Sequence, residues 1–306
     1  MIKKARSILS GFLAVCIALS ALTTVSSFFL RATLLSESFY LDIIATPTYM
    51  SKVTAAIKSD FQMQSSYSGI PQDVFEQTLS DGELHTMLRA HIRNTLAYLN
   101  NGGEYVEPEY PTESIKTPMY AFLDQYAVEN GLTLTAEDYA MVDEVVEDTG
   151  EVIKKHICLI DLDLVIGRDI FLKMMNLVRL AAQIATPALV VSLLCLAILV
   201  PIHGMSNWRK WLTWMMVGLW FPGAVFTVPA TVLAATGLTS RLAIDTPYLK
   251  YFVDSVLEKT NQYFLLNGLL IFSISTIILV FLAYTKREKS EKTRNYPVLQ
   301  QKNNNS

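Results

Sequence analysis

Charged side chains are scarce in this sequence. Asp, Glu, Lys and Arg make up 17% of the 306 residues, whereas soluble domains carry about 25%. The mean hydropathy is positive, at +0.32, and the formal net charge is −3. These values exclude a disordered chain and argue against an ordinary soluble enzyme. Because there is no surplus of positive charge, we expect no nucleic-acid partner.

Cysteine is also rare. The three residues are Cys16, Cys158 and Cys195, and two of them lie in long apolar stretches. Cys158 therefore has no partner for a disulfide within residues 31–179, which excludes an ectodomain held together by disulfides. The same residues contain no Asn-x-Ser/Thr glycosylation acceptor. Both absences favour a bacterial envelope over a eukaryotic secretory pathway, and Cys158 is expected to be a small buried apolar residue.

Sequence motifs of catalysis are missing as well. The chain has no Gly-x-Ser-x-Gly, no His-Glu-x-x-His and no Gly-x-x-x-x-Gly-Lys-Ser/Thr, which are patterns that carry a nucleophile, a zinc site or a phosphate loop. Acidic pairs such as Glu107/Glu109 and Asp143/Glu144 are typical of solvated surfaces. We therefore expect no enzymatic activity, no catalytic residues and no cofactor.

Metal-ligating residues follow no known spacing. His85 and His91 are six positions apart, so they lack the i, i+4 geometry of a zinc-binding helix. The run that starts at Asp161 resembles a calcium loop, but Val165 and Ile166 stand where an oxygen ligand and a glycine belong. The densest group of potential ligands consists of His156, Cys158, Asp161 and Asp163. We expect no specific metal site, and weak divalent-cation binding to acidic surfaces stays open.

Four long stretches carry no Asp, Glu, Lys, Arg or His, namely residues 7–30, 180–202, 211–240 and 260–285. A helix needs about 20 apolar residues to cross the hydrocarbon core of a bilayer. We therefore predict transmembrane helices over residues 7–30, 180–202, 211–236 and 262–285. The first stretch is longer than the apolar core of a signal peptide, which typically has about 7–15 residues, so we expect an uncleaved anchor, with a cleaved signal as the alternative. The lack of charge inside the spans argues against a carrier.

Basic residues predict the orientation. Residues 1–6, 203–210 and 286–306 together hold 11 Lys and Arg, which favours a plasma-membrane protein with both termini in the cytoplasm. Arg168, Lys173 and Arg179 flank the second span on the other side and argue against this orientation. Residues 31–179 and the loop 237–261 are then extracytoplasmic. Residues 31–179 contain 23 Asp and Glu against 11 Lys and Arg, a net charge of −12.

Helix signals dominate this acidic segment. Thr46-Pro47 and Thr117-Pro118 are expected to start helices, Asp81 to cap a further one, and Asn130-Gly131 to end one. Thr135 and Asp138 form an approximate capping box. Leu162-Asp163-Leu164 could also alternate as a strand, although a helix leading into the second span is favoured. The predicted fold class is an all-α membrane protein, with four transmembrane helices and a large α-helical extracytoplasmic domain between the first and second.

Two patterns in the spans concern packing and the bilayer. Ser10, Ala14 and Ala18 repeat every four residues, and such a seam of small residues favours helix–helix association. Pro187, Pro222 and Pro229 are expected to kink the second and third spans. Four tryptophans are typical of an aromatic belt at the surface of the lipid bilayer, namely Trp208, Trp211, Trp214 and Trp220.

These observations favour a non-enzymatic, multi-pass envelope protein. Its acidic outer domain is expected to bind a partner protein, a peptide or a cationic ligand, because a net negative field attracts cationic partners. The alternative is a transport or force-transmitting subunit. The order of one span, a large domain and three spans resembles that of MacB/FtsX-type permease subunits of ABC complexes, and the resemblance covers topology alone. The loop 203–210 is short for docking an ATPase.

Overall fold

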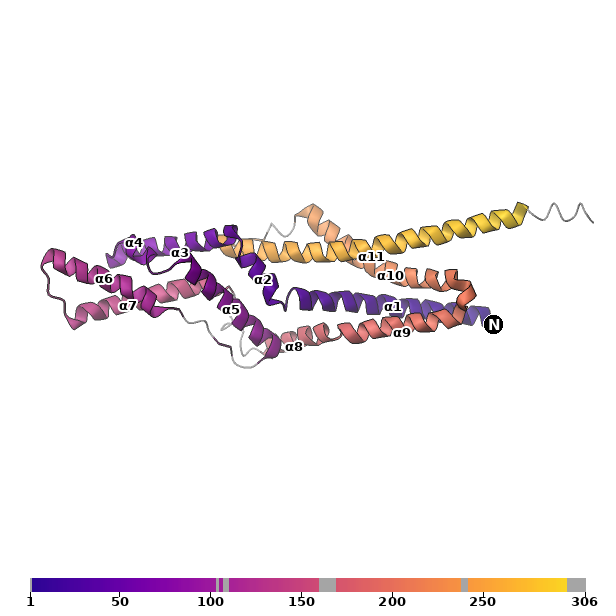
Figure 1. The fold of residues 1–306 in the computed structure, drawn as a ribbon, viewed down its shortest axis with the longest axis horizontal. Helices are drawn as coiled ribbons and strands as arrows, with labels where there is room; N and C mark the ends of the chain where they lie inside the picture. Colours follow the sequence, from indigo (N-terminus) through magenta and orange to yellow (C-terminus); the bar gives the residue numbers. More distant parts are fainter. Residues whose placement is uncertain (1, 103–104, 107–109, 160–168, 238–241, 296–306) are drawn as a thin grey trace, which may run out of the picture. The chain divides into compact units, whose positions relative to one another are not determined.

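The computed structural model describes residues 2–102, 105–106, 110–159, 169–237 and 242–295. Within these ranges all regular secondary structure is helical (Figure 1), which confirms the all-α prediction. The chain divides into two compact units. The span unit consists of Met1–Arg31, Val178–Thr239 and Glu258–Ser306, and the helical domain consists of Ala32–Leu177 and Ser240–Leu257.

Four helices are long and apolar enough to cross a membrane, as the sequence predicts. The candidate spans are Lys4–Ala32, Ala185–His203, Met205–Thr236 and Pro247–Arg287. They lie in α1 (Ile2–Ala32), α9 (Ala185–His203), α10 (Trp208–Thr236) and α11 (Pro247–Asn295), and a 3-10 turn, Met205–Asn207, precedes α10. This is the architecture of a multi-pass membrane protein.

The seam of small residues on α1 packs within the span unit. Ser10, Ala14 and Ala18 are all buried. The hydroxyl oxygen of Ser10 lies 2.8 Å from His203 Nε2 at the end of α9. A Cβ on Gly218 of α10 would lie 2.8 Å from the Ala14 carbonyl oxygen, so the missing side chain lets α1 and α10 approach closely. The apolar core beside this contact consists of Leu13, Ile17, Cys195 and Leu199.

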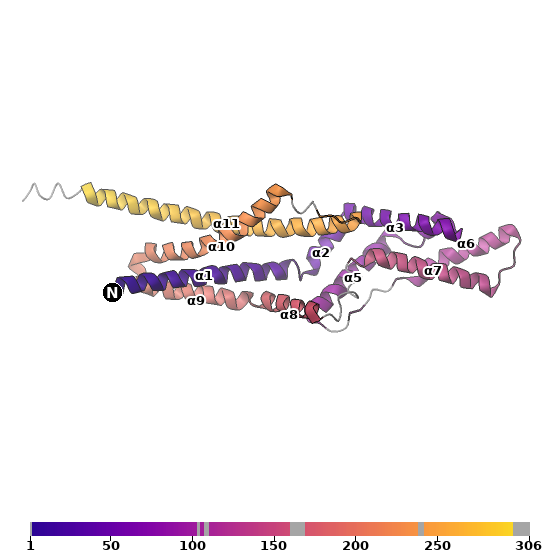
Figure 2. The same cartoon turned by 180° about the vertical axis from the view of Figure 1, so that it is seen from behind.

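Helices α10 and α11 cross at two glycines (Figure 1, Figure 2). A Cβ on Gly223 would lie 2.6 Å from the backbone nitrogen of Phe272, and one on Gly268 would lie 2.7 Å from Thr227 Oγ1. Real Cβ atoms do not approach that closely, so both contacts require glycine. Neither residue belongs to the Ser10–Ala18 seam, and the sequence pattern did not single them out.

The stretch predicted as the second span is divided between two helices. Helix α8 (Asp169–Gln183) ends before Ile184, and α9 begins at Ala185. Pro187 has no N–H to donate to the carbonyl of Gln183, which interrupts the helical hydrogen-bond pattern. Proline is well accepted in the first turn of a new helix. The kink expected at Pro187 is therefore a short interruption at Ile184.

The helical domain is built around one apolar core. Its helices are α2 (Glu37–Ile44), α3 (Pro47–Ser68), α4 (Gln72–Glu76), α5 (Asp81–Asn101), α6 (Thr112–Asn130) and α7 (Ala136–Ile157). Their inward faces repeat at helical spacing, as in Val53, Ile57 and Phe61 of α3, which are all buried. The largest fully buried side chains of this core include Tyr49, Phe61, Phe75, Leu84, Leu88 and Met119.

Helix ends mostly follow the expected signals. The Thr46 side chain accepts a hydrogen bond from the Tyr49 N–H at the start of α3, and Gly131 ends α6 with φ 62°. Thr135 caps α7 in a full capping box with Asp138. The expectation for Asp81 is wrong, because Ser80 is the N-cap of α5 and pairs with Glu83 in a capping box.

Helix α6 starts earlier than predicted. It begins at Thr112, so Pro118 lies inside the helix rather than at its first position. An interior proline costs about 3 kcal/mol through its lost hydrogen bond and its steric clash. Burial of Ile115 and Met119, which both have 0% exposure, offsets part of that cost, since each large apolar side chain contributes about 1.5–3 kcal/mol when fully buried.

Helix α11 begins inside the stretch expected to be an extracytoplasmic loop, residues 237–261. Its first residue is Pro247, and its opening turns belong to the helical domain. Tyr248 and Phe252 lie in the core of that domain, and the Phe252 ring centroid is 6.1 Å from that of Tyr40 on α2. A helix places residues four apart on the same side, so Tyr248 and Phe252 can both be buried in the core. The domain is therefore not made from residues 31–179 alone.

Candidate partner-binding surface

Helices α6 and α7 form an antiparallel hairpin fastened by tyrosine–carboxylate pairs. The Tyr139 hydroxyl donates a hydrogen bond to Asp124 Oδ1 at 2.6 Å, and the Tyr120 hydroxyl donates to Asp143 Oδ1 at 2.7 Å. The two tyrosine ring centroids lie 5.1 Å apart. Lys116 Nζ lies 2.8 Å from Asp143 Oδ1. The hairpin is thus held by contacts between side chains as well as by its shared core.

Negative charge accumulates on this hairpin. Residues 118–148 contain eight Asp and Glu and no Lys, Arg or His. Glu137, Glu144 and Asp148 are spaced seven and four residues apart on α7, so they share one helix face, and all three are exposed. Hydrogen bonds from Lys116 and Tyr120 hold the pKa of Asp143 below its usual range. Asp143 therefore keeps its negative charge within the hairpin.

Exposed apolar side chains surround the same hairpin. Val128 is 82% exposed, Leu132 and Met141 are each 56% exposed, and Tyr126 is 49% exposed. Tyr126 and Val128 lie in the last turns of α6, Leu132 follows the end of that helix, and Met141 lies between Glu137 and Glu144 on the acidic face of α7. We call these four residues together with Glu137, Glu144 and Asp148 the hairpin surface. It combines exposed apolar side chains with exposed carboxylates.

A second cluster joins α7 to α3 and to the first turn of α11. His156 is buried, its Nε2 lies 3.0 Å from Asp60 Oδ2, and its Nδ1 lies 3.1 Å from the Tyr248 hydroxyl. Lys155 Nζ also lies 3.0 Å from Asp60 Oδ2. A carboxylate only accepts hydrogen bonds, so the proton of neutral His156 sits on Nε2 and the Tyr248 hydroxyl donates to Nδ1. Both ring nitrogens of His156 thereby have a hydrogen-bond partner, one in Asp60 and one in Tyr248.

Electrostatics favours the neutral form of this histidine. Burial lowers the pKa of His156 and outweighs the opposing hydrogen bond and charge of Asp60. For Asp60 itself, burial raises the pKa, but the hydrogen bonds from Lys155 and His156 together outweigh it and hold the value below the usual range. The cluster therefore contains a neutral imidazole beside a charged carboxylate at pH 7. We call this cluster the clamp, because its contacts join α7 to α3 and to α11.

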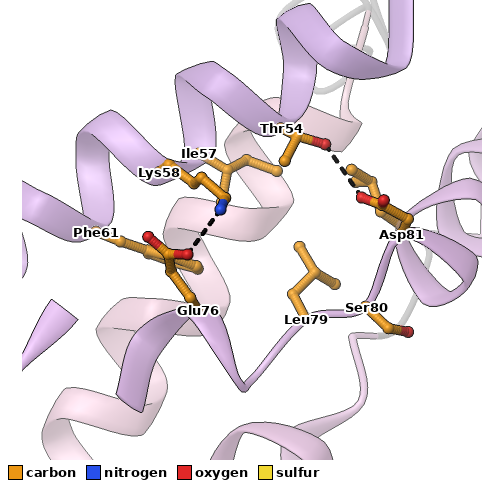
Figure 3. Close-up of a pocket in the computed structure, with 9 residues that line it drawn as sticks. Thr54, Ile57, Lys58, Phe61, Glu76, Leu79, Ser80 and Asp81 are labelled. Atoms are coloured by element: carbon orange, nitrogen blue, oxygen red, sulfur yellow. Dashed lines mark hydrogen bonds and ion pairs between the residues drawn. The ribbon is translucent and has the colours of Figure 1, made fainter. Parts of the chain in front are cut away.

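A small pocket of the helical domain lies between α3, α4 and the start of α5 (Figure 3). Lys58 Nζ lies 2.6 Å from Glu76 Oε2 across it, and the Thr54 hydroxyl lies 3.4 Å from Asp81 Oδ1. Its volume is about 20 Å³, which is room for one water molecule. The ion pair is partly exposed, so it remains accessible to water.

The structure describes only part of the candidate metal ligands of the sequence, namely His85, His91, His156 and Cys158. Among the described residues, no group of three His, Cys, Asp or Glu side chains is arranged to hold a metal ion. His156 is used by the clamp with Asp60 and Tyr248. Asp161, Asp163 and the alternative strand around residue 162 lie outside the described residues, as do Glu107 and Glu109.

Sequence patterns missed Tyr248 and Phe252, although a signal for them exists. Thr246-Pro247 repeats the helix-start pattern of Thr46-Pro47, and the apolar residues that follow have helical spacing. This helix start was not predicted because it lies between two transmembrane spans, where a short loop is the usual expectation.

Comparisons with protein-family models, with curated proteins and with solved structures found no match.

Proposed function

We propose that the helical domain lies on the extracytoplasmic side of a cell membrane and binds a cationic peptide or protein surface through the hairpin surface. The observation that carries this proposal is the overlap of exposed apolar side chains with exposed carboxylates in a segment without basic residues. Carboxylates attract a cationic partner over several ångströms, and apolar contact supplies the stability of the bound state. The role is that of a sensor or scaffold rather than of an enzyme.

The proposed orientation rests on the basic ends of the spans. Lys4 and Arg6 at the start of α1 and Arg209 and Lys210 at the start of α10 lie at one end of the span unit, since Ser10 contacts His203. A basic end of this kind favours the cytoplasm. Labelling a cysteine introduced by Glu144→Cys, in a Cys158→Ser background, with a membrane-impermeant maleimide should succeed on intact cells. Labelling that requires permeabilised cells would contradict this orientation.

Binding is tested with the full chain in nanodiscs of neutral lipid. The probe is a fluorescent amphipathic peptide of lysine and leucine, and fluorescence anisotropy measures its affinity. Neutralising Glu137→Gln, Glu144→Gln and Asp148→Asn should weaken binding about tenfold, and wild-type binding should weaken as salt shortens the Debye length to about 8 Å at 0.15 M. Val128→Ser with Leu132→Ser should weaken binding with little effect on this salt dependence.

The matched control carries the same charge change elsewhere on the domain. Asp42→Asn, Asp73→Asn and Glu113→Gln affect exposed carboxylates outside the hairpin surface, and this variant should bind almost as well as wild type. Equal losses in both triple variants would show that net charge alone attracts the peptide and would refute the hairpin surface. Reproducible co-purification of an ATPase would instead support the permease alternative.

A further inference from the structure

The span unit contains a cavity of about 780 Å³ between the start of α10 and the later turns of α11. The two helices touch through Gly223 and Gly268, and the cavity opens well beyond that crossing. Its volume is in the range of sites that hold small ligands. The residues that line it are Ser206, Asn207, Trp208, Arg209, Lys210, Thr213, Trp214, Leu279, Leu282, Ala283 and Lys286.

Three basic side chains line this cavity. Arg209 and Lys210 come from the first turn of α10, and Lys286 comes from α11, more than 70 residues later in the chain. None of the lining residues is acidic, and among the described residues neither Lys210 nor Lys286 forms an ion pair. The Arg209 guanidinium lies 5.5 Å from the Trp208 ring centroid, which fixes it beside an aromatic face. Three cations without an acidic partner in the lining favour an anionic occupant of this cavity.

The rest of the wall is apolar. Leu279, Leu282 and Ala283 of α11 face the cavity, and Trp214 of α10 lies opposite. These residues belong to the candidate spans, whereas the cations lie where those spans end. An occupant must therefore place an anion at the membrane surface and hydrocarbon along the helices. A free phosphate ion would leave the apolar wall unused.

We propose that this cavity binds one anionic phospholipid, with its phosphate between Arg209, Lys210 and Lys286 and an acyl chain along Leu279 and Leu282. Basic pockets between transmembrane helices at a membrane surface have the chemistry to hold anionic headgroups. Tryptophan rings at the same level suit the border between headgroup and hydrocarbon. The hydroxyl of exposed Ser206 supplies a further donor for a phosphate oxygen. The site is independent of the hairpin surface and of its proposed partner.

The test uses the full chain and phosphatidylglycerol as the probe. Native mass spectrometry of the detergent-solubilised protein counts retained lipid, and a titration gives the affinity against phosphatidylcholine. Wild type should retain one phosphatidylglycerol in preference to phosphatidylcholine. Changing Arg209→Gln, Lys210→Gln and Lys286→Gln together should weaken its binding at least about tenfold, since each cation near a membrane surface contributes severalfold. Equal affinity of wild type for the two lipids would overturn the proposal.

A matched control separates the cavity from net charge. Arg31→Gln, Lys173→Gln and Lys250→Gln remove three cations that do not line the cavity, and this variant should keep the affinity of wild type. A second variant, Ala283→Trp, fills the cavity without changing charge and should also lose the lipid. Retention of phosphatidylglycerol by both cavity variants, with their unfolding temperature in neutral lipid unchanged, would refute the site. Displacement of the lipid by inorganic phosphate would assign the cavity to a free anion and refute it as well.

Discussion

His156 Nε2 lies 3.0 Å from Asp60 Oδ2, which joins the end of α7 to the middle of α3. The same imidazole contacts Tyr248 through Nδ1, so one buried ring connects three helices of the helical domain. Since α11 continues from Tyr248 into a candidate span, this clamp acts on the helix that both units share. Its strength therefore affects how firmly the first turns of α11 are held in the domain.

Stability should fall as the pH drops below about 6.5, the value for histidine in an unfolded chain. Burial lowers the pKa of His156 in the folded protein, so between the two values the unfolded chain takes up a proton that the folded chain does not. The protein is therefore most stable above this window and loses stability as pH falls through it. Thermal unfolding of the full chain in nanodiscs between neutral and mildly acidic pH measures the effect. His156→Gln should flatten the slope, and an unchanged slope would contradict this assignment.

Removing the hydroxyl in Tyr248→Phe should destabilise the helical domain by about 1–3 kcal/mol, because His156 Nδ1 is then left buried without a donor. The matched control is Tyr67→Phe, since Tyr67 is 67% exposed and should tolerate the change with little effect. Chemical unfolding followed by circular dichroism gives both values. If the two variants were equally stable, the Tyr248 hydroxyl would have no part in the clamp.

Truncating Phe252→Ala should cost about 3–5 kcal/mol, as expected for an aromatic side chain removed from a packed core. Phe252 is part of the core of the helical domain although it lies more than 70 residues after Leu177. Val128→Ala is the control, because that side chain is 82% exposed. Hydrogen exchange should show faster exchange in α2 and α3 for Phe252→Ala alone. Unchanged exchange there would place the start of α11 outside the domain core.

Gly223→Leu should separate α10 from α11, since even a Cβ at this position would lie 2.6 Å from a backbone nitrogen. We expect a large loss of thermal stability in nanodiscs, because backbone atoms cannot move aside as a flexible side chain can. Gly82→Ala is the contrasting change. Nothing lies within 4 Å of a Cβ at this position. Replacing this helical glycine by alanine should therefore raise the free energy of unfolding by about 0.5–1 kcal/mol. A fully stable Gly223→Leu variant would argue against the crossing.

Local signals explain which parts of the domain were predictable. Thr46, Thr135 and Gly131 act through hydrogen bonds or dihedral angles of their immediate neighbours, so the sequence identifies them directly. Ser80 and Pro118 were misjudged because two adjacent residues can compete for one cap and because burial can retain an interior proline. The choice in such cases depends on which side chains reach the core.

One of the two candidate sites could be predicted from the sequence, and the other could not. The acidic character of α7 and the exposed position of its carboxylates follow from helical spacing, which the sequence contains. The cavity could not be predicted from the sequence, because Lys286 lies on a different helix from Arg209 and Lys210, and the packing of α10 and α11 places all three in one lining. The tryptophan cluster was expected to be an aromatic belt, and two of its members, Trp208 and Trp214, also line that cavity.

From the sequence by itself came the four long apolar helices, the all-helical class and the concentration of negative charge in residues 31–179, since each depends on composition or on neighbours within a few turns. The tertiary structure alone decided that α11 opens inside the helical domain, that His156 is neutral between Asp60 and Tyr248, and that three distant cations share one cavity. These features depend on contacts between residues far apart in the chain, where burial and close backbone approach determine the outcome.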